Sequence, residues 1–285
     1  MMETRILSAA ALEEFRGCLL RQERGTRTVE KYLRDAQAFY SFLPEGKQVD
    51  KEAVIRYKAH LTETYKAAST NSMLVAINRL LGFLGWQDCQ VKLLRIQRAN
   101  FREAKKELTK TEYQQLLSAA CRKKNERLCL LMQTLCSTGL RVSEHRFVTA
   151  EALRCGTARV RNKGKERIVL LPPELVTRLL AYCKSKGVDS GAVFVTRSGR
   201  PMERTNIWAD MKRLCAEAGV EPGKVYPHNL RHLFALTYYR QQGDVIGLAD
   251  VLGHSSVETT RIYTTTSGEE QKRRVAGLGL VGHSL

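Results

Sequence analysis

The chain has 285 residues, of which 43% are hydrophobic, enough to build a packed core in one large domain or in two of ordinary size. Its 47 Lys and Arg against 29 Asp and Glu give a formal net charge of +18, which favours a phosphate-rich partner, since each cation that neutralises a phosphate releases counterions. No apolar run approaches the roughly 20 residues that span a bilayer, and the first residues lack the pattern of a signal peptide, so we expect a cytoplasmic protein with no membrane partner.

The first part of the chain is predicted to be helical throughout. Apolar residues recur at helical spacing between residues 8 and 86, and Pro44 with Gly46 marks one break. Four helices fit this pattern, the first of them ending near Gly25. The residues expected to begin or cap these helices are, in chain order, Ser8, Thr26 or Thr28, Asp50, and Ser69 or Thr70.

A change of composition predicts a domain boundary. Residues 95–107 are basic and poor in apolar side chains, as in a linker between two domains. We therefore assign residues 1–94 to a helical domain, 95–107 to a linker, 108–266 to a second domain and 267–285 to a C-terminal tail.

The second domain is predicted to begin with helices and then to contain a β-hairpin. Thr109 and Glu112 have the spacing of a capping box, followed by helices over 110–122 and 125–137. Residues 157–171 alternate as two short strands joined by a turn at 162–165. The predicted fold class is therefore mainly α with a small β-hairpin.

Beyond the hairpin we expect helices separated by glycine and proline. Pro172 and Pro173 end the second strand and open the next helix, and later breaks fall near Gly219 and Gly243. Ser255 and Glu258 have capping-box spacing, and we expect them to open a short helix that carries Tyr263.

The cysteines do not indicate a metal site. All eight are scattered, none forms a CxxC pair, and none lies near a histidine at zinc spacing. Several, such as Cys129 and Cys136, lie in apolar helical segments. We interpret the cysteines as small buried side chains in a reducing compartment, and we expect no metal and no cofactor.

Chemically versatile side chains occur in the second half in a definite order. Each alone has an ordinary structural explanation, such as a helix-end arginine or a half-buried tyrosine. Their order and spacing together indicate a site. The set is Arg141 after Thr138-Gly139-Leu140, Lys163 at the hairpin tip, His228, Arg231 and His232 in HNLRH, His254 after Leu252-Gly253, and Tyr263 nine residues further on.

These residues lie in segments that resemble the tyrosine recombinase, or phage integrase, family in its short Xer-like or mobile-element type. The segments are STGLRVSE (137–144), RVRNKGKERIVLLP (159–172), HNLRHLFA (228–235) and LGHSSVETTRIYT (252–264). The resemblance spans about residues 107–265, and the helical residues 1–94 are similar, less distinctively, to the core-binding domain of that family. It implies a two-domain DNA clamp. Since the first predicted helix begins so early, we expect the arm-site domain of larger phage integrases to be absent.

The resemblance also implies roles for the catalytic residues. Tyr263 is the nucleophile, which attacks the scissile phosphate and leaves a 3′-phosphotyrosine and a free 5′-hydroxyl, so that no nucleotide is consumed. Arg141 and Arg231 hold the non-bridging oxygens with charged, bidentate donors, and His254 donates a further hydrogen bond.

Proton transfer and support of the arginine fall to other residues in the same scheme. His228 is the candidate base for the phenol, and Glu144 supports Arg141. Lys163 is the general acid for the leaving 5′-oxygen. Because the turn is one residue shorter than the common Lys-Gly-x-Lys form, Lys165 is the alternative. His232 is interpreted as structural.

One stretch departs from the family pattern. After Glu144 the family usually continues with apolar residues, whereas this chain has His145 and Arg146. This difference weakens the local match without touching the catalytic positions.

The resemblance implies that the partner is double-stranded DNA with inverted-repeat core sites. It also implies that a homotetramer on two DNA sites exchanges the DNA strands through a Holliday junction. It leaves open whether accessory proteins are required. Arg27, Lys31 and Arg34 either read a DNA groove or form a solvated helix face, and Lys165 is a further candidate for DNA binding. The tail, through Val275, Leu278 and Leu280, is expected to dock on a neighbouring protomer, and the protein is expected to associate with the nucleoid.

The biological role has a preferred interpretation and alternatives. We favour integration and excision of a mobile element over Xer-type resolution of chromosome or plasmid dimers. A type I topoisomerase with the same phosphotyrosine chemistry, and a non-catalytic DNA-binding regulator with the same fold, are further alternatives. A metal-dependent nuclease is disfavoured, because the sequence has no clustered set of carboxylates.

Overall fold

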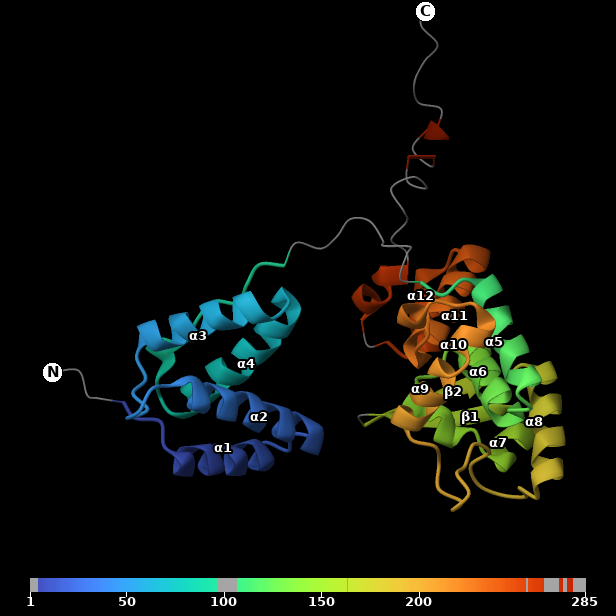
Figure 1. Cartoon of the computed structure of the whole chain (residues 1–285), viewed down its shortest axis with the longest axis horizontal. Helices are drawn as coiled ribbons and strands as arrows, with labels where there is room; N and C mark the ends of the chain where they lie inside the picture. Colours follow the sequence, from blue (N-terminus) through green and yellow to red (C-terminus); the bar gives the residue numbers. More distant parts are fainter. Residues whose placement is uncertain are drawn as a thin grey trace, which may run out of the picture. The chain divides into compact units, whose positions relative to one another are not determined.

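The computed structural model of the chain describes residues 5–96, 107–162, 164–254, 256–263, 272–273 and 276–278. The chain divides into two compact units, residues 1–98 and 99–285 (Figure 1). Within the described residues, helices dominate and the strands form a single two-stranded antiparallel sheet. The predicted fold class is confirmed.

Unit 1 is a bundle of four α-helices. The α1–α2 pair packs against the α3–α4 pair, with most contacts between α2 and α4 (Figure 1). Its core is mostly aliphatic, and two buried aromatic rings within it, those of Phe39 and Tyr57, lie 5.0 Å apart between centroids. The elements are α1 (Ala9–Arg21), α2 (Thr26–Phe42), α3 (Lys51–Thr64), α4 (Ala67–Phe83) and the 3₁₀ turn η1 (Gln87–Cys89).

Two of the four predicted helix caps are confirmed. The Ser8 hydroxyl accepts a hydrogen bond from the Ala11 amide at 3.1 Å, and the Asp50 carboxylate accepts one from Ala53 at 2.6 Å. Each side chain satisfies an amide that has no partner inside the helix. The first helix ends at Arg21, four residues before the predicted Gly25.

The predicted cap of the second helix and the predicted start of the fourth are wrong, although α2 does begin at Thr26. The carbonyl of Gly25 closes the first turn of α2, and that of Lys66 closes the first turn of α4, with no side-chain cap in either case. Thr70 lies inside α4, where its buried hydroxyl donates to the Leu61 carbonyl at 3.1 Å and ties α4 to α3. A tertiary contact therefore uses the hydroxyl that the sequence pattern assigned to a cap.

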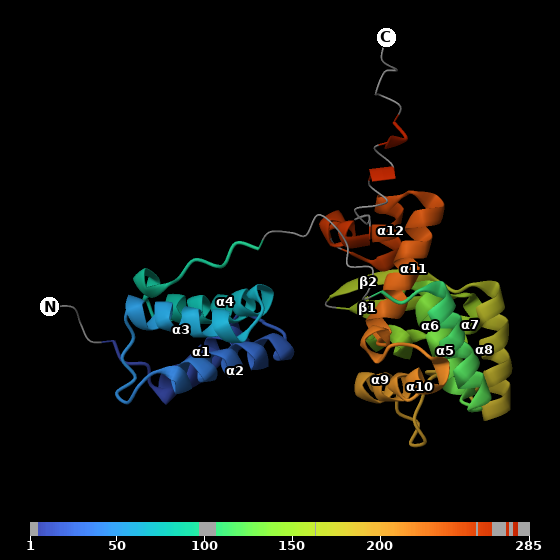
Figure 2. The ribbon, with the colours of Figure 1, turned by 45° about the horizontal axis from the view of Figure 1, so that its top comes forward.

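Unit 2 is built around α6 and α11, which pack against each other, with α5 and α8 beside α6 and the hairpin against η3 and α7 (Figure 2). Its main core gathers buried side chains from most of these helices. The elements are α5 (Lys110–Arg122), α6 (Glu126–Thr138), η3 (Val142–Phe147), α7 (Ala150–Cys155), β1 (Thr157–Asn162), β2 (Lys165–Leu170), α8 (Pro173–Lys186), α9 (Arg204–Lys212), α10 (Cys215–Ala218), η4 (Pro222–Lys224), α11 (Pro227–Gln242), α12 (Val245–Leu252), η5 (Val257–Thr259) and η6 (Arg261–Tyr263).

Local signals predicted much of unit 2 correctly. Thr109 and Glu112 form the expected capping box, with reciprocal bonds of 3.1 and 2.8 Å. The hairpin pairs Asn162 with Lys165, which agrees with the predicted position of the turn. Lys163 lies outside the described residues.

The predicted short helix around Tyr263 is wrong in type. Ser255 lies outside the described residues, and it is the Ser256 hydroxyl that accepts from the Glu258 amide, at 3.2 Å. The segment forms two 3₁₀ turns, η5 and η6, because amides bond three residues back: Thr260 to Val257 at 2.8 Å, and Tyr263 to Thr260 at 2.9 Å.

The interpretation of the cysteines is correct in part. Cys89, Cys129, Cys183 and Cys215 are buried, but Cys121 and Cys155 are exposed, so that interpretation is wrong for these two. Their helices α5 and α7 turn these positions outward from the core. In the described part of the chain, no helix is both long and apolar enough to cross a membrane.

Candidate active site

A cleft of about 560 Å³ in unit 2 gathers most of the residues that the sequence singled out. It lies between the hairpin, the turn after α6, the start of α11 and the 3₁₀ turns after α12. The predicted residues that line it are Arg141, Lys165, His228, Arg231, His254 and Tyr263, and Asn162 and Arg167 line it as well.

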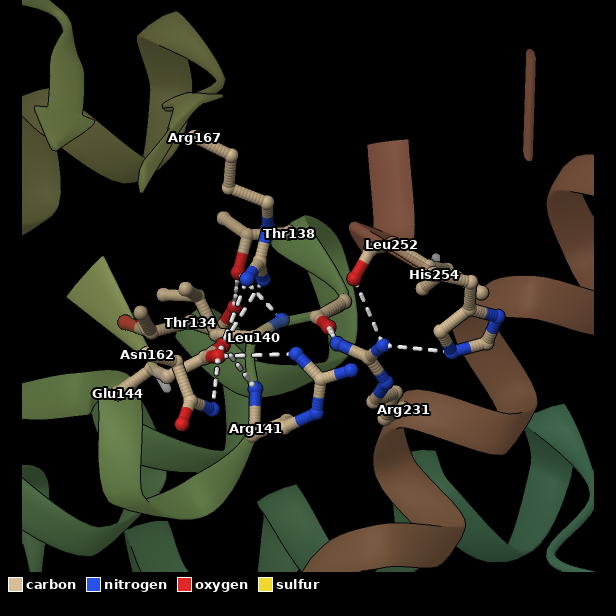
Figure 3. A network of polar contacts seen from close by, with 11 residues as sticks. Thr134, Thr138, Leu140, Arg141, Glu144, Asn162, Arg167, Arg231, Leu252 and His254 are labelled. Carbon is tan, nitrogen blue, oxygen red and sulfur yellow. Dashed lines mark hydrogen bonds and ion pairs between the residues drawn. The ribbon is translucent and has the colours of Figure 1, made fainter. Parts of the chain in front are cut away.

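The turn that presents Arg141 requires glycine. Gly139 ends α6 in the left-handed region at φ +64°, and a Cβ there would lie 2.6 Å from the Phe234 ring. Two residues later, the Arg141 amide donates to Glu144 at 2.8 Å and its guanidinium donates at 3.0 Å (Figure 3). Glu144 therefore holds both the backbone and the side chain of Arg141.

Glu144 is buried, and other donors surround it. Arg167 gives its carboxylate two hydrogen bonds of 3.0 and 2.8 Å, and the Asn162 amide gives one of 3.3 Å. Burial raises the pKa of Glu144, but hydrogen bonds from Arg167 and from the Arg141 backbone outweigh it and lower the pKa to about 2. Glu144 is therefore an ionised carboxylate at neutral pH.

Arg167 was not among the residues predicted to form the site. A signal was present, because the hairpin register pairs Arg167 with Val160 and strand alternation puts it on the same face as buried Val169. A charged residue on the buried face of a strand needs a partner.

Arg231 is 1% exposed and is oriented by backbone carbonyls. Its guanidinium donates to Gly139 at 2.5 Å and to Leu252 at 2.8 Å, and it lies 2.9 Å from His254 Nε2 (Figure 3). Burial and the nearby Arg141 charge lower the pKa of Arg231 to about 10, so the group stays charged at neutral pH. Its Nε is buried and has no hydrogen-bond partner among the described residues.

His254 is held in a defined tautomer. Because Arg231 can only donate, His254 Nε2 is the acceptor, and Nδ1 carries the proton and donates to the Thr260 hydroxyl at 2.8 Å. Burial, followed by the charges of Arg231 and Arg141, lowers the pKa of His254 to about 4. The ring is neutral at physiological pH. Thr260, which is fully buried, was missed by the sequence analysis.

Tyr263 lies in η6 with its side chain 2% exposed. Its ring is nearly parallel to that of His254, at 11° and 6.3 Å between centroids, and it packs against His232 at 4.9 Å. His232 also approaches Glu107 at 3.5 Å. Tyr263 thus lies beside the histidine that contacts Arg231.

His228 lies at the start of α11 and is exposed to solvent. Desolvation by the surrounding protein lowers its pKa, and the charges of Arg231 and Arg141 lower it further. Its ring is therefore mostly neutral at physiological pH, the form that can accept a proton.

The hairpin lysines are only partly described. Lys165 is exposed at the start of β2 and lines the cleft, whereas Lys163 lies outside the described residues. The choice between them as general acid stays a prediction.

In unit 1, the three basic residues proposed for groove reading differ in their surroundings. Arg27 and Arg34 are exposed on α2. Lys31 donates to Asp35 at 2.5 Å and to the Ser72 carbonyl at 2.8 Å, which ties α2 to α4. Their DNA contact stays a prediction.

The two residues that depart from the family pattern fit the fold. His145 is 3% exposed, packs against Phe194 and contacts the Val142 carbonyl, and burial lowers its pKa. The neutral ring fills a place in the interior. Arg146 is exposed and lies over the Phe147 ring.

Within the described ranges, no group of three or more His, Cys, Asp or Glu side chains is arranged to hold a metal ion. The positive side chains that line the cleft are instead those of Arg141, Lys165, Arg167 and Arg231, of which Arg167 is paired with Glu144. Guanidinium groups bind phosphate oxygens in a bidentate manner.

Comparison with known proteins agrees with this geometry. The model of the phage integrase family matches residues 106–270. Tyrosine recombinase XerA of Thermococcus kodakarensis is 28% identical over 271 residues, covering 92% of this chain and 93% of that protein. Tyrosine recombinase XerD of Proteus mirabilis is 31% identical over 275 residues, covering 89% and 87%.

Solved structures share the fold. A lambda integrase tetramer bound to a Holliday junction has a TM-score of 0.72 at 17% identity and covers 92% of this chain and 78% of that one. The Tn1549 transposon integrase in complex with transposon right-end DNA has a TM-score of 0.72 at 15% identity, with coverage of 95% and 99%. The chain belongs to the phage integrase family and is a tyrosine recombinase, an enzyme that cleaves and rejoins DNA.

Proposed function

We propose that this enzyme is a site-specific recombinase in which Tyr263 is the nucleophile. The observation that carries the proposal is the convergence of Arg141, Arg231, His254 and Tyr263 on one cleft. The phenol oxygen attacks phosphorus, the bond to the 5′-oxygen breaks, and a 3′-phosphotyrosine and a 5′-hydroxyl result. A 5′-hydroxyl from the partner strand then attacks the same phosphorus and releases Tyr263, so the covalent link conserves the bond energy.

Arg141 and Arg231 stabilise the negative charge on the non-bridging oxygens during both steps. Arg231 stays charged at neutral pH, and its buried, unpartnered Nε supplies a donor. His254 donates to the phosphate only after its proton moves from Nδ1 to Nε2, because Nε2 is the acceptor in the DNA-free site.

The proton from Tyr263 passes to His228, whose lowered pKa keeps its ring neutral. The leaving 5′-oxygen takes a proton from Lys163, with Lys165 as the alternative. Both are hairpin lysines, and Lys165 lines the cleft.

The substrate is double-stranded DNA with inverted-repeat core sites, held by a core-binding domain of residues 1–94 and a catalytic domain of residues 108–266. Two rounds of exchange pass through a Holliday junction in a homotetramer, the assembly of the similar lambda integrase structure. The tail of residues 267–285 docks on the neighbouring protomer. Leu278 is 63% exposed, and Val275 and Leu280 lie outside the described residues.

Two biological roles fit this chemistry. Integration and excision of a mobile element is supported by the fold shared with the Tn1549 transposon integrase. Xer-type dimer resolution is supported by the Xer relatives that this chain matches over about nine-tenths of their length. Either role places the protein at the nucleoid.

The test traps the covalent intermediate. Wild type and Tyr263→Phe are incubated in EDTA with a pool of nicked duplexes that carry randomised inverted repeats, and protein–DNA adducts are separated on a denaturing gel. We expect an adduct with wild type and none with Tyr263→Phe. An adduct that persists in Tyr263→Phe, or no adduct on DNA that the protein binds, contradicts the proposal and favours the non-catalytic regulator.

A further inference from the structure

Arg167 lines the cleft and contacts two separate parts of it, Glu144 and the turn at Gly253. Its side chain is 14% exposed, and both of its terminal nitrogens donate to Glu144, the carboxylate that holds Arg141 (Figure 3). A bidentate guanidinium–carboxylate pair fixes both position and orientation. Arg167 and Arg141 thus share one acceptor from opposite sides.

Arg167 also packs against the segment that carries His254. Gly253 adopts φ +63°, and a Cβ built on it would lie 2.4 Å from Arg167 Cδ. In the hairpin, Arg167 follows Lys165 by two residues on β2. One side chain therefore contacts the support of Arg141 and the turn before His254, and it lies on the strand that begins with a candidate general acid.

We propose that Arg167 is a positioning residue for strand cleavage, which fixes Glu144 and through it the guanidinium of Arg141 against the scissile phosphate. This inference rests on the proposed function. Arg167 is not assigned to touch DNA or the reacting atoms. Its effect on the reaction passes through Glu144.

The charges around Glu144 explain why Arg167 matters. The carboxylate faces Arg141 on its own turn, Arg167 on β2, Asn162 on β1 and the charge of Arg231 on α11. Arg167 makes the largest contribution that lowers the pKa of Glu144, against the opposing effect of burial. Without Arg167 the pKa of Glu144 rises, and a protonated Glu144 no longer holds Arg141 as an acceptor of two bonds.

The test measures single-turnover adduct formation between pH 5.5 and 8.5, at saturating protein, for wild type, Arg167→Gln and Arg167→Lys. Arg154→Gln, an exposed arginine outside the cleft, controls for the loss of one charge. We expect Arg167→Gln to form the adduct about 10- to 100-fold more slowly than wild type at neutral pH, the loss typical when a residue that orients a metal ligand is removed. Its DNA affinity stays within about threefold of wild type. Arg167→Lys keeps the charge without the bidentate geometry and falls between.

The pH profile separates positioning from a general loss of structure. The rate for Arg167→Gln falls more steeply towards acid pH than that of wild type, because protonation of Glu144 adds to the protonation of His228 that both proteins share. Adding Glu144→Gln to Arg167→Gln removes the extra fall. A parallel pH profile, or a rate within twofold of wild type, overturns the proposal.

A modified substrate tells whether Arg167 acts through Arg141 or through the hairpin lysine. A 5′-bridging phosphorothiolate releases a thiolate, which needs no proton from a general acid. We expect the Arg167→Gln defect to persist on it, and full recovery overturns the proposal. If wild type forms no adduct, the proposed function fails; if wild type and Arg167→Gln react alike, only this inference fails.

Two thiols on the neighbouring helices α5 and α6 lie close together. Cys121 is exposed near the end of α5, and its sulfur lies 3.6 Å from that of buried Cys129 in α6. Both are free thiols, and Gln133 donates to the Cys129 sulfur at 3.2 Å. The accessible thiol of the pair is thus in van der Waals contact with a second one that can resolve its oxidised form.

We propose that Cys121 and Cys129 form a peroxide-sensitive disulfide. The Cys121 thiol loses its proton as its sulfur attacks a peroxide oxygen, the O–O bond breaks, and a sulfenic acid forms while the leaving hydroxide takes up a proton and becomes one water. The Cys129 sulfur then attacks the sulfenic sulfur, the S–S bond forms and a second water leaves. Two thiols are oxidised by two electrons, and one peroxide is reduced to two waters.

Mass spectrometry tests this site on the full-length native protein treated with hydrogen peroxide. We expect a loss of two hydrogens that dithiothreitol reverses, and a linked Cys121–Cys129 peptide. Cys121→Ser and Cys129→Ser abolish the link, while Cys155→Ser, which removes another exposed thiol, retains it. Sulfinic or sulfonic acid at Cys121 without a cross-link overturns the proposal.

Discussion

Glu144 accepts hydrogen bonds from Arg141, Asn162 and Arg167, and its pKa lies at about 2, below the ordinary value of 4.5. The folded protein therefore binds this proton less tightly than the unfolded chain does. The ionised carboxylate contributes stability above about pH 4.5, and this contribution is lost as pH falls towards 2.

The consequence is a pH-dependent difference between wild type and Glu144→Gln. Wild type has the larger free energy of unfolding at neutral pH, and we expect this advantage to shrink by about 3 kcal/mol between pH 4.5 and 2, as protonated Glu144 comes to resemble glutamine. Urea unfolding at a series of pH values measures it. A difference that stays constant across this window contradicts the ionised state of Glu144.

Thr260 orients His254 in both tautomers, since its buried hydroxyl accepts the Nδ1 proton in the DNA-free site and can donate to Nδ1 once the proton lies on Nε2. We expect Thr260→Val, which keeps the volume and removes the hydroxyl, to slow adduct formation about tenfold, and Thr260→Ser to restore most of the rate. Exposed Thr177 on α8, which lies outside the cleft and donates its hydroxyl to the Pro173 carbonyl at 3.0 Å, supplies the matched control, Thr177→Val. Equal rates in Thr260→Val and Thr177→Val are the result against this role.

At the scale of elements, substitutions at two glycines that end helices distinguish the cost of backbone strain from the cost of crowding a side chain. Gly139 ends α6 and Gly156 ends α7, both in the left-handed region, but a Cβ meets Phe234 only at Gly139 and open space at Gly156. We expect Gly156→Ala to cost about 1 kcal/mol, and Gly139→Ala to cost about 1 to 3 kcal/mol more through overpacking. Thermal unfolding of the two variants compares them. Equal costs contradict the close packing of the Arg141 turn.

Elements with local signals were predictable from the sequence. The capping box of Thr109 and Glu112 and the hairpin turn after Asn162 depend on residues within a few positions of each other. Thr70 was misassigned because its hydroxyl bonds to another helix. The spacing of residues near Thr70 in the sequence does not indicate a contact with another helix.

The site residues likewise include some that were predictable from the sequence and one that was not. Motif order located Arg141, Arg231, His254 and Tyr263, which the structure brings together in one cleft. Arg167 was missed because its partner, Glu144, lies 23 residues away in the sequence. Whether a residue of an amphipathic strand binds such a partner is decided by tertiary packing, which one sequence does not reveal.

At the scale of the whole molecule, the net charge of +18 predicts DNA affinity that depends steeply on salt. A protein of this charge can neutralise roughly six to ten phosphates. Its affinity for DNA then falls about 10³- to 10⁵-fold as the salt concentration rises from 50 to 200 mM. Fluorescence anisotropy with a labelled duplex measures the slope. A change of less than tenfold contradicts binding dominated by phosphate contacts.

The most direct test of the central claim identifies the covalent bond itself. The adduct from the nicked-duplex reaction is digested with protease and nuclease, and tandem mass spectrometry locates the nucleotide on the peptide that contains Tyr263. The proposed mechanism predicts a 3′-phosphate ester on the Tyr263 oxygen and a 5′-hydroxyl on the released strand. A nucleotide on another residue, or a 5′-phosphate linkage, contradicts it.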